Sequence, residues 1–351
     1  MHSEEIIVGL SGGIDSLVSL FLLKKQGFSP IGVSLQIPNW KNKENNFSFL
    51  RSFSKKFNVP YFAIDARKEF KEVVVKYFLD SLKKGETPNP CIICNRYFKI
   101  KKLLEFAKKH NIKYVATGHY AKIEYSNKKK EYLLKRGVDR EKDQSYFLAI
   151  LPQRWLSHLT FPLGEYTKKE VKKLAEKYKI PEFAKKKESQ DFCYVSSKEK
   201  NNFLLDKIGK REGNIVTEDG RIIGKHQGIY FFTIGQRKGI KIPGKILYVK
   251  GINPKKNLVI VTEKKDELEK KEIEVSPFHF ISSSFTKENK IKGEVKTRYK
   301  SQSTKAILHH KKRKSKKVKI AFQKEKTFPT PGQFAVFYKE DICLGGGPIK
   351  R

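Results

Sequence analysis

The sequence predicts an α/β fold: an N-terminal twisted parallel sheet covered by helices on both faces, a small central domain that is mostly β, and an all-β C-terminal domain. Two observations predict it. In the first half of the chain, short apolar runs alternate with segments of helical periodicity, which is typical of a parallel sheet whose crossover helices cover both faces. After about residue 193, glycine-bounded segments rich in β-branched and aromatic residues dominate.

The first half repeats an order of strand, loop and helix. An apolar run at 6–10 predicts the first strand, and leucines at helical spacing over 16–26 predict a helix that ends at Gly27. The same reasoning gives further strands at 31–35, 61–64 and 114–117, and further helices at 49–57, 70–83 and 95–110.

The length of 351 residues exceeds what one hydrophobic core usually serves, so more than one domain is expected. In the second half, β segments are expected at 228–234, 246–249 and 258–262. The charged stretch 263–272 has few apolar residues and marks the end of the central domain. We therefore expect three domains, at 1–202, 203–271 and 272–351.

Lys and Arg number 75 against 37 Asp and Glu, which leaves a net charge of +38. This excess is more than solubility requires and indicates a polyanionic partner. A lysine-rich surface that is merely solvated is the competing interpretation, and the lysine runs at 128–130 and 311–317 fit both.

No apolar run approaches the length of a membrane span, and the polar, acidic N-terminus lacks the regions of a secretion signal. We therefore expect a soluble, cytoplasmic protein.

A glycine-rich loop, residues 11–16 (Ser-Gly-Gly-Ile-Asp-Ser), joins the first predicted strand to the first helix. Backbone N–H groups and the helix dipole at such a junction favour a phosphate group. A Walker-type loop ends in Gly-Lys-Ser/Thr, but Leu17 follows Ser16 here, which disfavours transfer of a γ-phosphoryl group. The simpler alternative is a tight turn without a ligand, in which Asp15 is only an acid favoured by the first turn of a helix. We expect Asp15 to face the nucleotide or its magnesium ion.

Two cysteines follow a proline-rich loop at 87–90 (Thr-Pro-Asn-Pro). The prolines favour an extended loop, and Asn95 is typical of the start of a helix. Cys94 is therefore expected at a helix N-terminus, where the dipole, Arg96 and Lys99 would lower the pKa of its thiol and populate the thiolate. This arrangement predicts a nucleophile.

The chain has four cysteines, too few for a disulfide framework at this length, so they are better interpreted as reactive groups. Cys91 and Cys94 form the Cys-x-x-Cys pattern of a zinc half-site. Neither Cys193 nor Cys343 belongs to a second such pair, which disfavours a four-cysteine zinc site. From the residues alone, a buried and unreactive Cys91 and an ordinary core Cys193 are open alternatives.

Several motifs resemble those of known enzymes. The glycine-rich loop resembles the pyrophosphate loop of the N-type ATP pyrophosphatases, which release pyrophosphate while adenylating a substrate oxygen. Six further motifs follow this loop along the chain, at residues 87–95, 116–120, 142–147, 189–193, 233–239 and 343–347. Together the motifs resemble, in the same order and over nearly the whole chain, those of the tRNA-specific 2-thiouridylases. The resemblance implies an N-terminal domain like the adenine nucleotide alpha hydrolases and a C-terminal β-barrel.

The resemblance also implies a reaction. Members of that family adenylate the C2 oxygen of the wobble uridine in tRNAs for lysine, glutamate and glutamine, and then replace this oxygen by sulfur to give 2-thiouridine. By resemblance, Cys193 carries the incoming sulfur as a persulfide, and Cys94 is the nucleophile that resolves the reaction by forming a disulfide with Cys193. Some members have Asp where this sequence has Cys91. A cysteine desulfurase, or a relay protein downstream of one, is the implied sulfur donor.

ATP with Mg²⁺ is the cofactor that the resemblance implies, with no permanently bound metal. The implied ATP site comprises Gly9, Leu10, Ser11, Gly12, Gly13, Ile14, Asp15, Ser16, Leu35 and Gly118. The implied tRNA site comprises Asn89, Pro90, Cys91, His119, Lys142, Asp143, Gln144, Arg298, Tyr299 and Gln333. From the residues alone, Leu35 and Gly118 look structural, and Arg298 with Tyr299 also fits an ordinary strand with a solvated arginine.

Two other functions fit part of the sequence. One is a different AMP-forming enzyme of the same nucleotide fold that uses ammonia, but such a reaction needs no persulfide carrier, so the cysteines argue against it. The other is an RNA-binding module that has lost catalysis. The charge and the β-rich second half fit such a module, whereas the intact phosphate loop argues against it.

Overall fold

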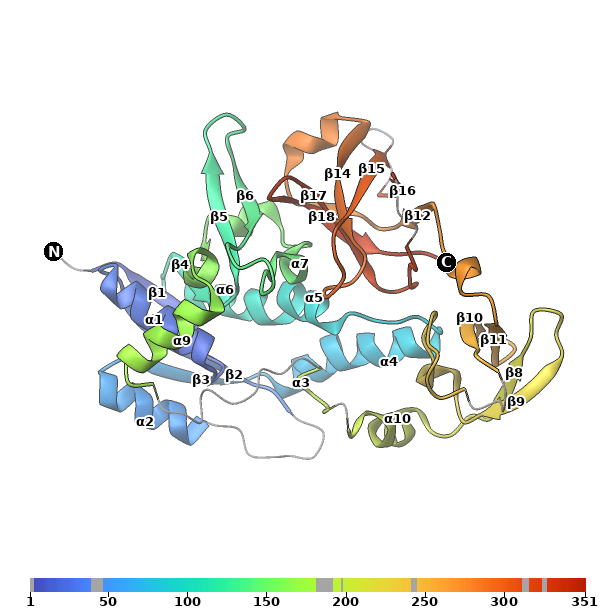
Figure 1. Cartoon of the computed structure of the whole chain (residues 1–351). Helices are drawn as coiled ribbons and strands as arrows, with labels where there is room; N and C mark the ends of the chain where they lie inside the picture. Colours follow the sequence, from blue (N-terminus) through green and yellow to red (C-terminus); the bar gives the residue numbers. More distant parts are fainter. Residues whose placement is uncertain are drawn as a thin grey trace.

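The computed structural model describes residues 3–38, 47–180, 192–196, 198–240, 245–310, 316–323 and 327–351. Three sheets organise these residues. In Figure 1 the N-terminal parallel sheet lies at one end, the small central sheet at the other, and the C-terminal antiparallel sheet above and between them. The predicted fold class is confirmed.

The N-terminal sheet is parallel, with the strand order β3-β2-β1-β4-β7. Its strands are β1 (Glu5–Gly9), β2 (Ser29–Gln36), β3 (Tyr61–Asp65), β4 (Tyr114–Thr117) and β7 (Leu159–Thr160). The chain leaves β1 on one side to form β2 and later returns on the other side as β4. The carboxyl ends of β1 and β4 therefore flank a topological switch point, the place where open α/β sheets bind ligands.

Helices cover both faces of this sheet because alternate side chains of β1 point in opposite directions. Ile6 and Val8 face a cluster with three helices, which are α1 (Ile14–Lys25), α2 (Phe47–Phe57) and α9 (Lys168–Lys177). Ile7 faces the other side and packs with α6 (Ile100–Lys109). Strands β1 to β4 and helices α1 and α2 lie within a few residues of their predicted positions, whereas β7 and α9 were not predicted.

Two long helical runs connect β3 to β4, and each contains a π-helical turn. The first comprises α3 (Arg67–Phe70), the turn Lys71–Val75 and α4 (Lys76–Lys83). The second comprises α5 (Pro90–Cys94), the turn Asn95–Lys99 and α6. This second run, which we call the cysteine helix, starts at Pro90, so the predicted start at Asn95 was wrong.

The central part begins with α10 (Lys200–Ile208), a helix that the sequence did not predict, and the expected boundary at 202 falls inside it. Its sheet has the order β10-β11-β8-β9. These strands are β8 (Gly213–Val216), β9 (Ile222–His226), β10 (Tyr248–Asn253) and β11 (Leu258–Thr262). The expected strand at 228–234 is instead a 3₁₀ turn, Ile229–Phe231, and a second 3₁₀ turn covers Lys265–Leu268.

The C-terminal sheet is antiparallel and recruits a hairpin from the N-terminal half of the chain. Its order is β12-β16-β15-β14-β17-β18-β6-β5, and β13 also pairs with β18. The hairpin strands are β5 (Ala121–Ser126) and β6 (Glu131–Arg136). The others are β12 (Glu272–Val275), β13 (His279–Phe280), β14 (Lys290–Lys296), β15 (Thr304–His310), β16 (Val318–Phe322), β17 (Phe334–Lys339) and β18 (Ile342–Pro348). Lys135 of β6 pairs with Ile342 of β18, which joins the N-terminal half of the chain to its C-terminal end.

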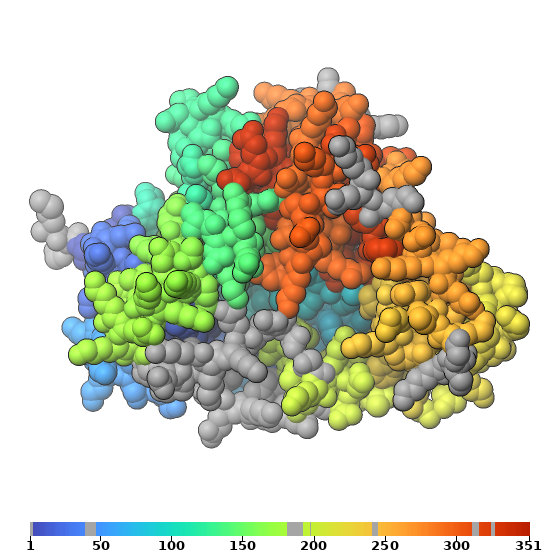
Figure 2. Space-filling view, in the orientation of Figure 1, coloured from blue at the N-terminus to red at the C-terminus, as the bar shows by residue number. Residues whose placement is uncertain are grey.

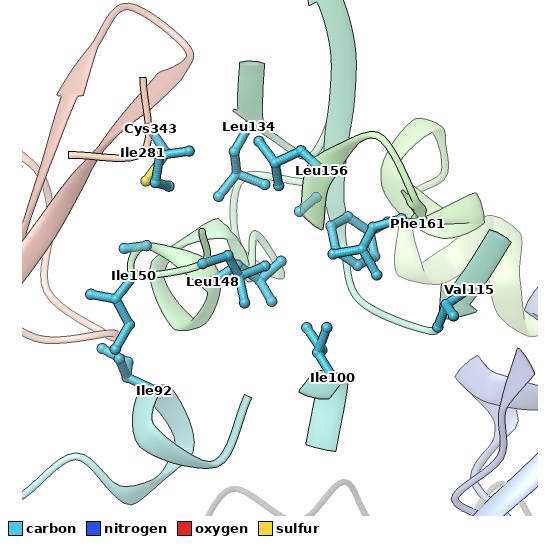
Figure 3. Close-up of a cluster of buried hydrophobic side chains, with 14 of the residues drawn as sticks. Ile92, Ile100, Val115, Leu134, Leu148, Ile150, Leu156, Phe161, Ile281 and Cys343 are labelled. Atoms are coloured by element: carbon cyan, nitrogen blue, oxygen red, sulfur yellow. The ribbon is translucent and has the colours of Figure 1, made fainter. Parts of the chain in front are cut away.

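One hydrophobic core packs against the cysteine helix and is formed by residues of both the N-terminal and the C-terminal parts of the chain. It packs Ile92 and Ile100 with Ile281 and Cys343, and it includes the short helices α7 (Ser145–Leu148) and α8 (Gln153–Leu156) (Figure 3). The 3₁₀ turns Pro162–Glu165 and Ser283–Lys287 complete the connections around it. Because Cys343 is only 1% exposed, its thiol belongs to this core.

In the space-filling view of Figure 2 the orange C-terminal part covers the middle of the molecule, between the blue and green N-terminal part and the yellow central part. None of the described helices is both long enough and apolar enough to cross a membrane.

Candidate active site

The glycine-rich loop forms a compact turn at the carboxyl end of β1. Gly12 has a φ of +79°, a conformation that favours glycine. Gly13 is the N-cap of α1 and makes no side-chain cap hydrogen bond, so the first N–H groups of the helix lack the partner that a Ser, Thr, Asp or Asn cap would supply. The hydroxyl of Ser16 donates to the Gly13 carbonyl at 2.9 Å and closes the loop. This geometry suits a phosphate group.

Gly118 follows β4 and packs directly on this loop. A Cβ atom at this position would lie 2.8 Å from the Asp15 carbonyl carbon and 2.9 Å from the Ser16 nitrogen, closer than side-chain atoms approach backbone. Leu35 lies at the carboxyl end of β2 and packs against a different cluster, the one that also holds Cys94. The two outlying residues of the predicted ATP site therefore lie at the ends of strands that flank β1.

Asp15 has partners that the sequence did not reveal. Its two carboxylate oxygens accept from the Lys168 Nζ at 2.7 and 2.9 Å, and one of them also accepts from the Tyr120 hydroxyl at 2.8 Å. Lys168 is buried, with 8% exposure, at the start of α9. A capping box of Thr167 and Glu170 fixes this helix start and is a local sequence signal for it, but not for the ion pair.

The start of the cysteine helix is set by Asn89 and Pro90. The Asn89 side chain accepts from the Ile92 N–H at 3.3 Å, and Pro90 occupies the first helical position, where its missing N–H costs nothing. Cys94 is therefore the fifth residue of the helix, one turn inside it. The expectation that Cys94 lies at the helix N-terminus was wrong, because Asn89 rather than Asn95 caps the helix.

The thiols of Cys91, Cys94 and Cys193 lie close enough to influence one another electrostatically. All three are free. Burial raises the pKa of Cys94 to about 11, although the Lys99 charge opposes this effect, and burial also raises the pKa of Cys91. For Cys193, loss of hydration around the sulfur and the neighbouring thiols raise the pKa to about 12, although the residue as a whole is exposed. The predicted lowering of the Cys94 pKa is therefore wrong for this state of the protein, because burial outweighs the lysine.

An aromatic cluster brings Cys193 to Cys94. Phe192 packs on Phe78, with ring centroids 4.8 Å apart, and Tyr194 packs on Phe70 at 6.0 Å. Cys94 contacts this same cluster. Of the motif 189–193, Phe192 and Cys193 are described, and residues 189–191 lie outside the described residues.

Lys99 and His119 connect the thiols to the phosphate loop. The Lys99 Nζ lies 3.2 Å from His119 Nε2, and His119 Nδ1 lies 2.6 Å from the Thr117 hydroxyl. Since an ammonium group can only donate, Nε2 accepts and Nδ1 carries the proton. Burial first, and then the Lys99 charge, hold the pKa of His119 well below its ordinary value of 6.5. His119 is thus a neutral residue that holds Lys99, directly after Gly118.

Residues of the predicted tRNA site from distant parts of the chain meet near Asn89. The Gln333 amide donates to the Thr87 carbonyl at 3.2 Å. The Tyr299 ring packs on Phe147, with centroids 4.3 Å apart. Arg298, beside it, reaches the buried Thr330 hydroxyl. The structure therefore brings Arg298, Tyr299 and Gln333 to the region where Asn89 and Pro90 begin the cysteine helix.

The run 142–144 has a role in the fold. The Asp143 carboxylate is 3% exposed and accepts from the Gly137 and Ser145 N–H groups at 3.2 and 3.1 Å. The Gln144 side chain accepts from the Tyr120 N–H at 3.1 Å. The Asp143 side chain is therefore not presented to a ligand, and Lys142 is half-buried. Within the described ranges, no group of three or more His, Cys, Asp or Glu side chains is arranged to hold a metal ion.

Comparison with known sequence families covers nearly the whole chain. Residues 4–197 match the family described as "tRNA methyl transferase HUP domain". Residues 201–263 match "tRNA methyl transferase PRC-barrel domain", and residues 270–349 match "Aminomethyltransferase beta-barrel domain". The three matches follow one another in the order of the three sheets.

Curated relatives extend over the full length. The chain is 39% identical to "tRNA-specific 2-thiouridylase MnmA 1" of Caldanaerobacter subterraneus subsp. tengcongensis, over 99% of this chain and 98% of that protein. It is 37% identical to "tRNA-specific 2-thiouridylase MnmA" of Caldicellulosiruptor saccharolyticus, over 99% of both. A solved structure, "U34-tRNA thiolase NcsA from Methanococcus maripaludis with its [4Fe-4S] cluster", is more remote: 19% identity, a TM-score of 0.37, and coverage of 60% of this chain and 68% of that one. From the full-length relatives, the chain belongs to the family of tRNA-specific 2-thiouridylases.

Proposed function

We propose that the chain uses ATP to replace the C2 oxygen of the wobble uridine of tRNA by sulfur, with Cys94 and Cys193 as the catalytic pair. One observation carries the assignment of these residues. Cys94 and Cys193 are about 100 positions apart in the sequence, yet Phe192 and Tyr194, the neighbours of Cys193, pack in the same cluster as Cys94. Lys99 and His119 link them to Gly118, which packs on the phosphate loop.

The first step activates the oxygen. The C2 carbonyl of uridine is amide-like, and its oxygen leaves poorly. Transfer of AMP from ATP to this oxygen, with release of pyrophosphate, makes it a good leaving group. The loop from Gly9 to Ser16 supports this role because it presents helix N–H groups without a side-chain cap to a polyphosphate.

The second step transfers sulfur. A persulfide on Cys193 attacks C2: a C–S bond forms, the C2–O bond breaks, and AMP leaves with the electron pair. The Cys94 thiolate then attacks the Cys193 Sγ. The bond between Cys193 and the transferred sulfur breaks, its electron pair stays on that sulfur, and the product takes up a proton at N3 as 2-thiouridine. A cellular dithiol reduces the resulting Cys94–Cys193 disulfide before the next turnover.

Mg²⁺ would accompany ATP at the loop. This ion requires an octahedron of oxygen ligands and usually takes them from one or two carboxylates, phosphates and water. Asp15 supplies a carboxylate, but both of its oxygens accept from Lys168. Phosphate and water oxygens would therefore supply most of the ligands, and the ion would neutralise charge on the leaving pyrophosphate.

The substrate base must leave its stack to reach these groups. Bases of an anticodon loop can be splayed out and inserted into a pocket, whereas duplex bases must first be unpaired. The arrangement of Asn89, Arg298, Tyr299 and Gln333 beside the cysteine helix supports an anticodon site there. The preferred substrates would be the tRNAs for lysine, glutamate and glutamine, and the sulfur would come from a cysteine desulfurase or a relay protein.

Mass spectrometry of tRNA tests the proposal. With ATP, Mg²⁺ and a persulfide donor, the wild-type protein should convert uridine to 2-thiouridine. Cys193→Ser should abolish thiolation but retain tRNA-dependent release of pyrophosphate, because adenylation precedes sulfur transfer. Cys343→Ala is the matched control, and it should retain thiolation because the Cys343 thiol is buried in the core. Thiolation by Cys193→Ser, or loss of its pyrophosphate release, would contradict the assigned role.

A further inference from the structure

The π-helical turn Asn95–Lys99 changes which side chain lies on the same side of the helix as Cys94. The Ile100 N–H donates to the Asn95 carbonyl, five residues earlier, which is the spacing of a π turn. At 3.6 residues per turn, a side chain five positions after Cys94 would point about 140° away from it. The wider turn rotates Lys99 back toward the side of Cys94, and the Lys99 charge lowers the pKa of the Cys94 thiol.

Other contacts fix the Lys99 ammonium in this place. It lies 3.2 Å from His119 Nε2, and the Thr117 hydroxyl holds the opposite side of the His119 ring. Its charge lowers the pKa of the Cys91, Cys94 and Cys193 thiols, so it lies near all three.

The other expected cation, Arg96, is engaged elsewhere. Its guanidinium donates to the Ile150 carbonyl and lies over the Tyr97 ring, 5.1 Å from the ring centroid. Arg96 is not among the groups that act on the Cys94 thiol. The sequence predicted that both Arg96 and Lys99 would lower the pKa of the Cys94 thiol, but in the structure only Lys99 does so.

We propose that Lys99 activates Cys94: its ammonium stabilises the Cys94 thiolate, and the π turn is the feature of the helix that brings the two groups together. The step is an ionisation. The S–H bond breaks, the proton passes to water, and the electron pair stays on sulfur beside the ammonium. This inference rests on the proposed function, in which the Cys94 thiolate is the nucleophile that resolves the persulfide.

The groups that face Cys94 are few. Cys91 comes from the same helix and Cys193 from the segment after residue 191, while His119, from the loop after β4, contacts Lys99. The two cysteines are neutral thiols and His119 is neutral, because burial shifts the pKa of each toward its uncharged form. Among the described residues, Lys99 is therefore the only cation that acts on the Cys94 thiol.

The pH dependence of Cys94 alkylation by iodoacetamide, followed by peptide mass spectrometry on the full chain, tests this proposal. Lys99→Met should raise the apparent pKa of Cys94 by about one unit, so alkylation at a fixed neutral pH slows about tenfold. Lys99→Gln keeps a donor for His119 but no charge, and it should shift the profile by a similar amount. Lys99→Arg should stay close to the wild-type profile.

Lys108→Met, an exposed position at the end of α6, is the matched control and should leave the profile unchanged. A wild-type profile in both Lys99→Met and Lys99→Gln would overturn the proposal. If Lys99→Met fails to fold, Lys99→Gln still separates the charge from the hydrogen bond. Thiolation of tRNA is measured separately: its absence in the wild-type protein would refute the proposed function, while the alkylation profile would still report on Lys99.

Discussion

At the scale of single residues, the contact between Asp15 and Lys168 shows how the phosphate loop tolerates an acid. A carboxylate beside a polyphosphate would repel it, but the Lys168 ammonium binds both Asp15 oxygens. Lys168 therefore supplies at the loop a cation that the sequence motif lacks.

Replacement of this lysine should weaken nucleotide binding. In Lys168→Met the Asp15 carboxylate keeps the Tyr120 hydroxyl but loses its cationic partner, so it faces the phosphates with an uncompensated charge. We expect the Kd for ATP, measured by isothermal titration calorimetry, to rise about tenfold or more, which corresponds to about 1.4 kcal/mol. Lys169→Met changes the next, exposed residue of α9 and should leave the Kd unchanged. An equal Kd for both variants would show that Lys168 serves only the fold.

The sequence was informative about residues whose chemistry is local and uninformative about their partners. The glycines of the loop and the Cys-x-x-Cys pattern can be recognised in the sequence, because backbone conformation and thiol chemistry restrict the residue type at these positions. Lys168 is one of many lysines, and its contact with Asp15 spans 153 positions. The raised pKa of Cys94 was equally hidden, because burial is a property of the folded chain.

At the scale of elements, the β5–β6 hairpin fastens the N-terminal part to the C-terminal sheet. The Glu131 carboxylate accepts from the Ser283 N–H at 3.1 Å and from the hydroxyl groups of Ser282, Ser283 and Ser284. Burial alone would raise the pKa of Glu131, but these hydrogen bonds hold it below the ordinary value of 4.5. The ionised Glu131 side chain is therefore one of the groups that dock the hairpin, together with Arg136, which pairs with Glu294 of β14 at 3.1 Å.

Removal of this carboxylate should loosen the hairpin. Hydrogen bonds to a charged group contribute about 1.5–3 kcal/mol, so Glu131→Ala should destabilise the protein by about 2 kcal/mol and lower the midpoint of thermal unfolding. Since the folded pKa is depressed, the contribution of Glu131 is present above its unfolded pKa and is lost as the pH falls through the folded pKa. The difference between wild type and variant should therefore shrink in acid.

Glu124→Ala is the matched control on the same hairpin. Glu124 pairs with Lys135 at 2.6 Å, but its side chain is 60% exposed, and surface ion pairs contribute little. Its melting midpoint should stay close to that of the wild-type protein at every pH. A Glu131→Ala midpoint equal to that of Glu124→Ala would show that the hairpin is held by its apolar face.

The sequence predicted elements well where periodicity decides them. Strand β4 has the predicted bounds, Tyr114–Thr117, because its apolar run is flanked by clear breaks. The start of the cysteine helix was misplaced because Asn89 and Asn95 are both good caps, and Pro90 was interpreted as part of an extended loop rather than as the first helical residue. The π turns and the docking of the hairpin on β18 depend on partners distant in sequence, which no local pattern reports.

At the scale of the whole molecule, the three parts meet at the loop before the cysteine helix. The Thr87 N–H donates to the Pro331 carbonyl at 2.8 Å, and the hydroxyl groups of Thr87 and Thr233 lie 3.3 Å apart. Gly332 has a φ of +89°, and a side chain there would collide with Thr87 backbone. The order of the parts was predictable from composition, whereas their convergence on Thr87 was not, because it depends on packing between domains.

The proposed anticodon site belongs to a molecule with 38 excess positive charges. Binding of tRNA should therefore depend steeply on salt concentration. Each neutralised phosphate releases counterions, and a protein with about six phosphate contacts loses about a thousandfold in affinity between ~50 and ~200 mM salt. We expect a linear plot of log Kd against log salt concentration, in which Kd rises about a thousandfold over this salt range. The measurement is filter binding with unmodified tRNA. Binding of ATP, measured over the same salt range, is the control for general effects of salt on the fold. A nearly flat response for tRNA would show that the lysines are only solvated, and would leave base stacking on side chains such as Tyr299 to supply the affinity.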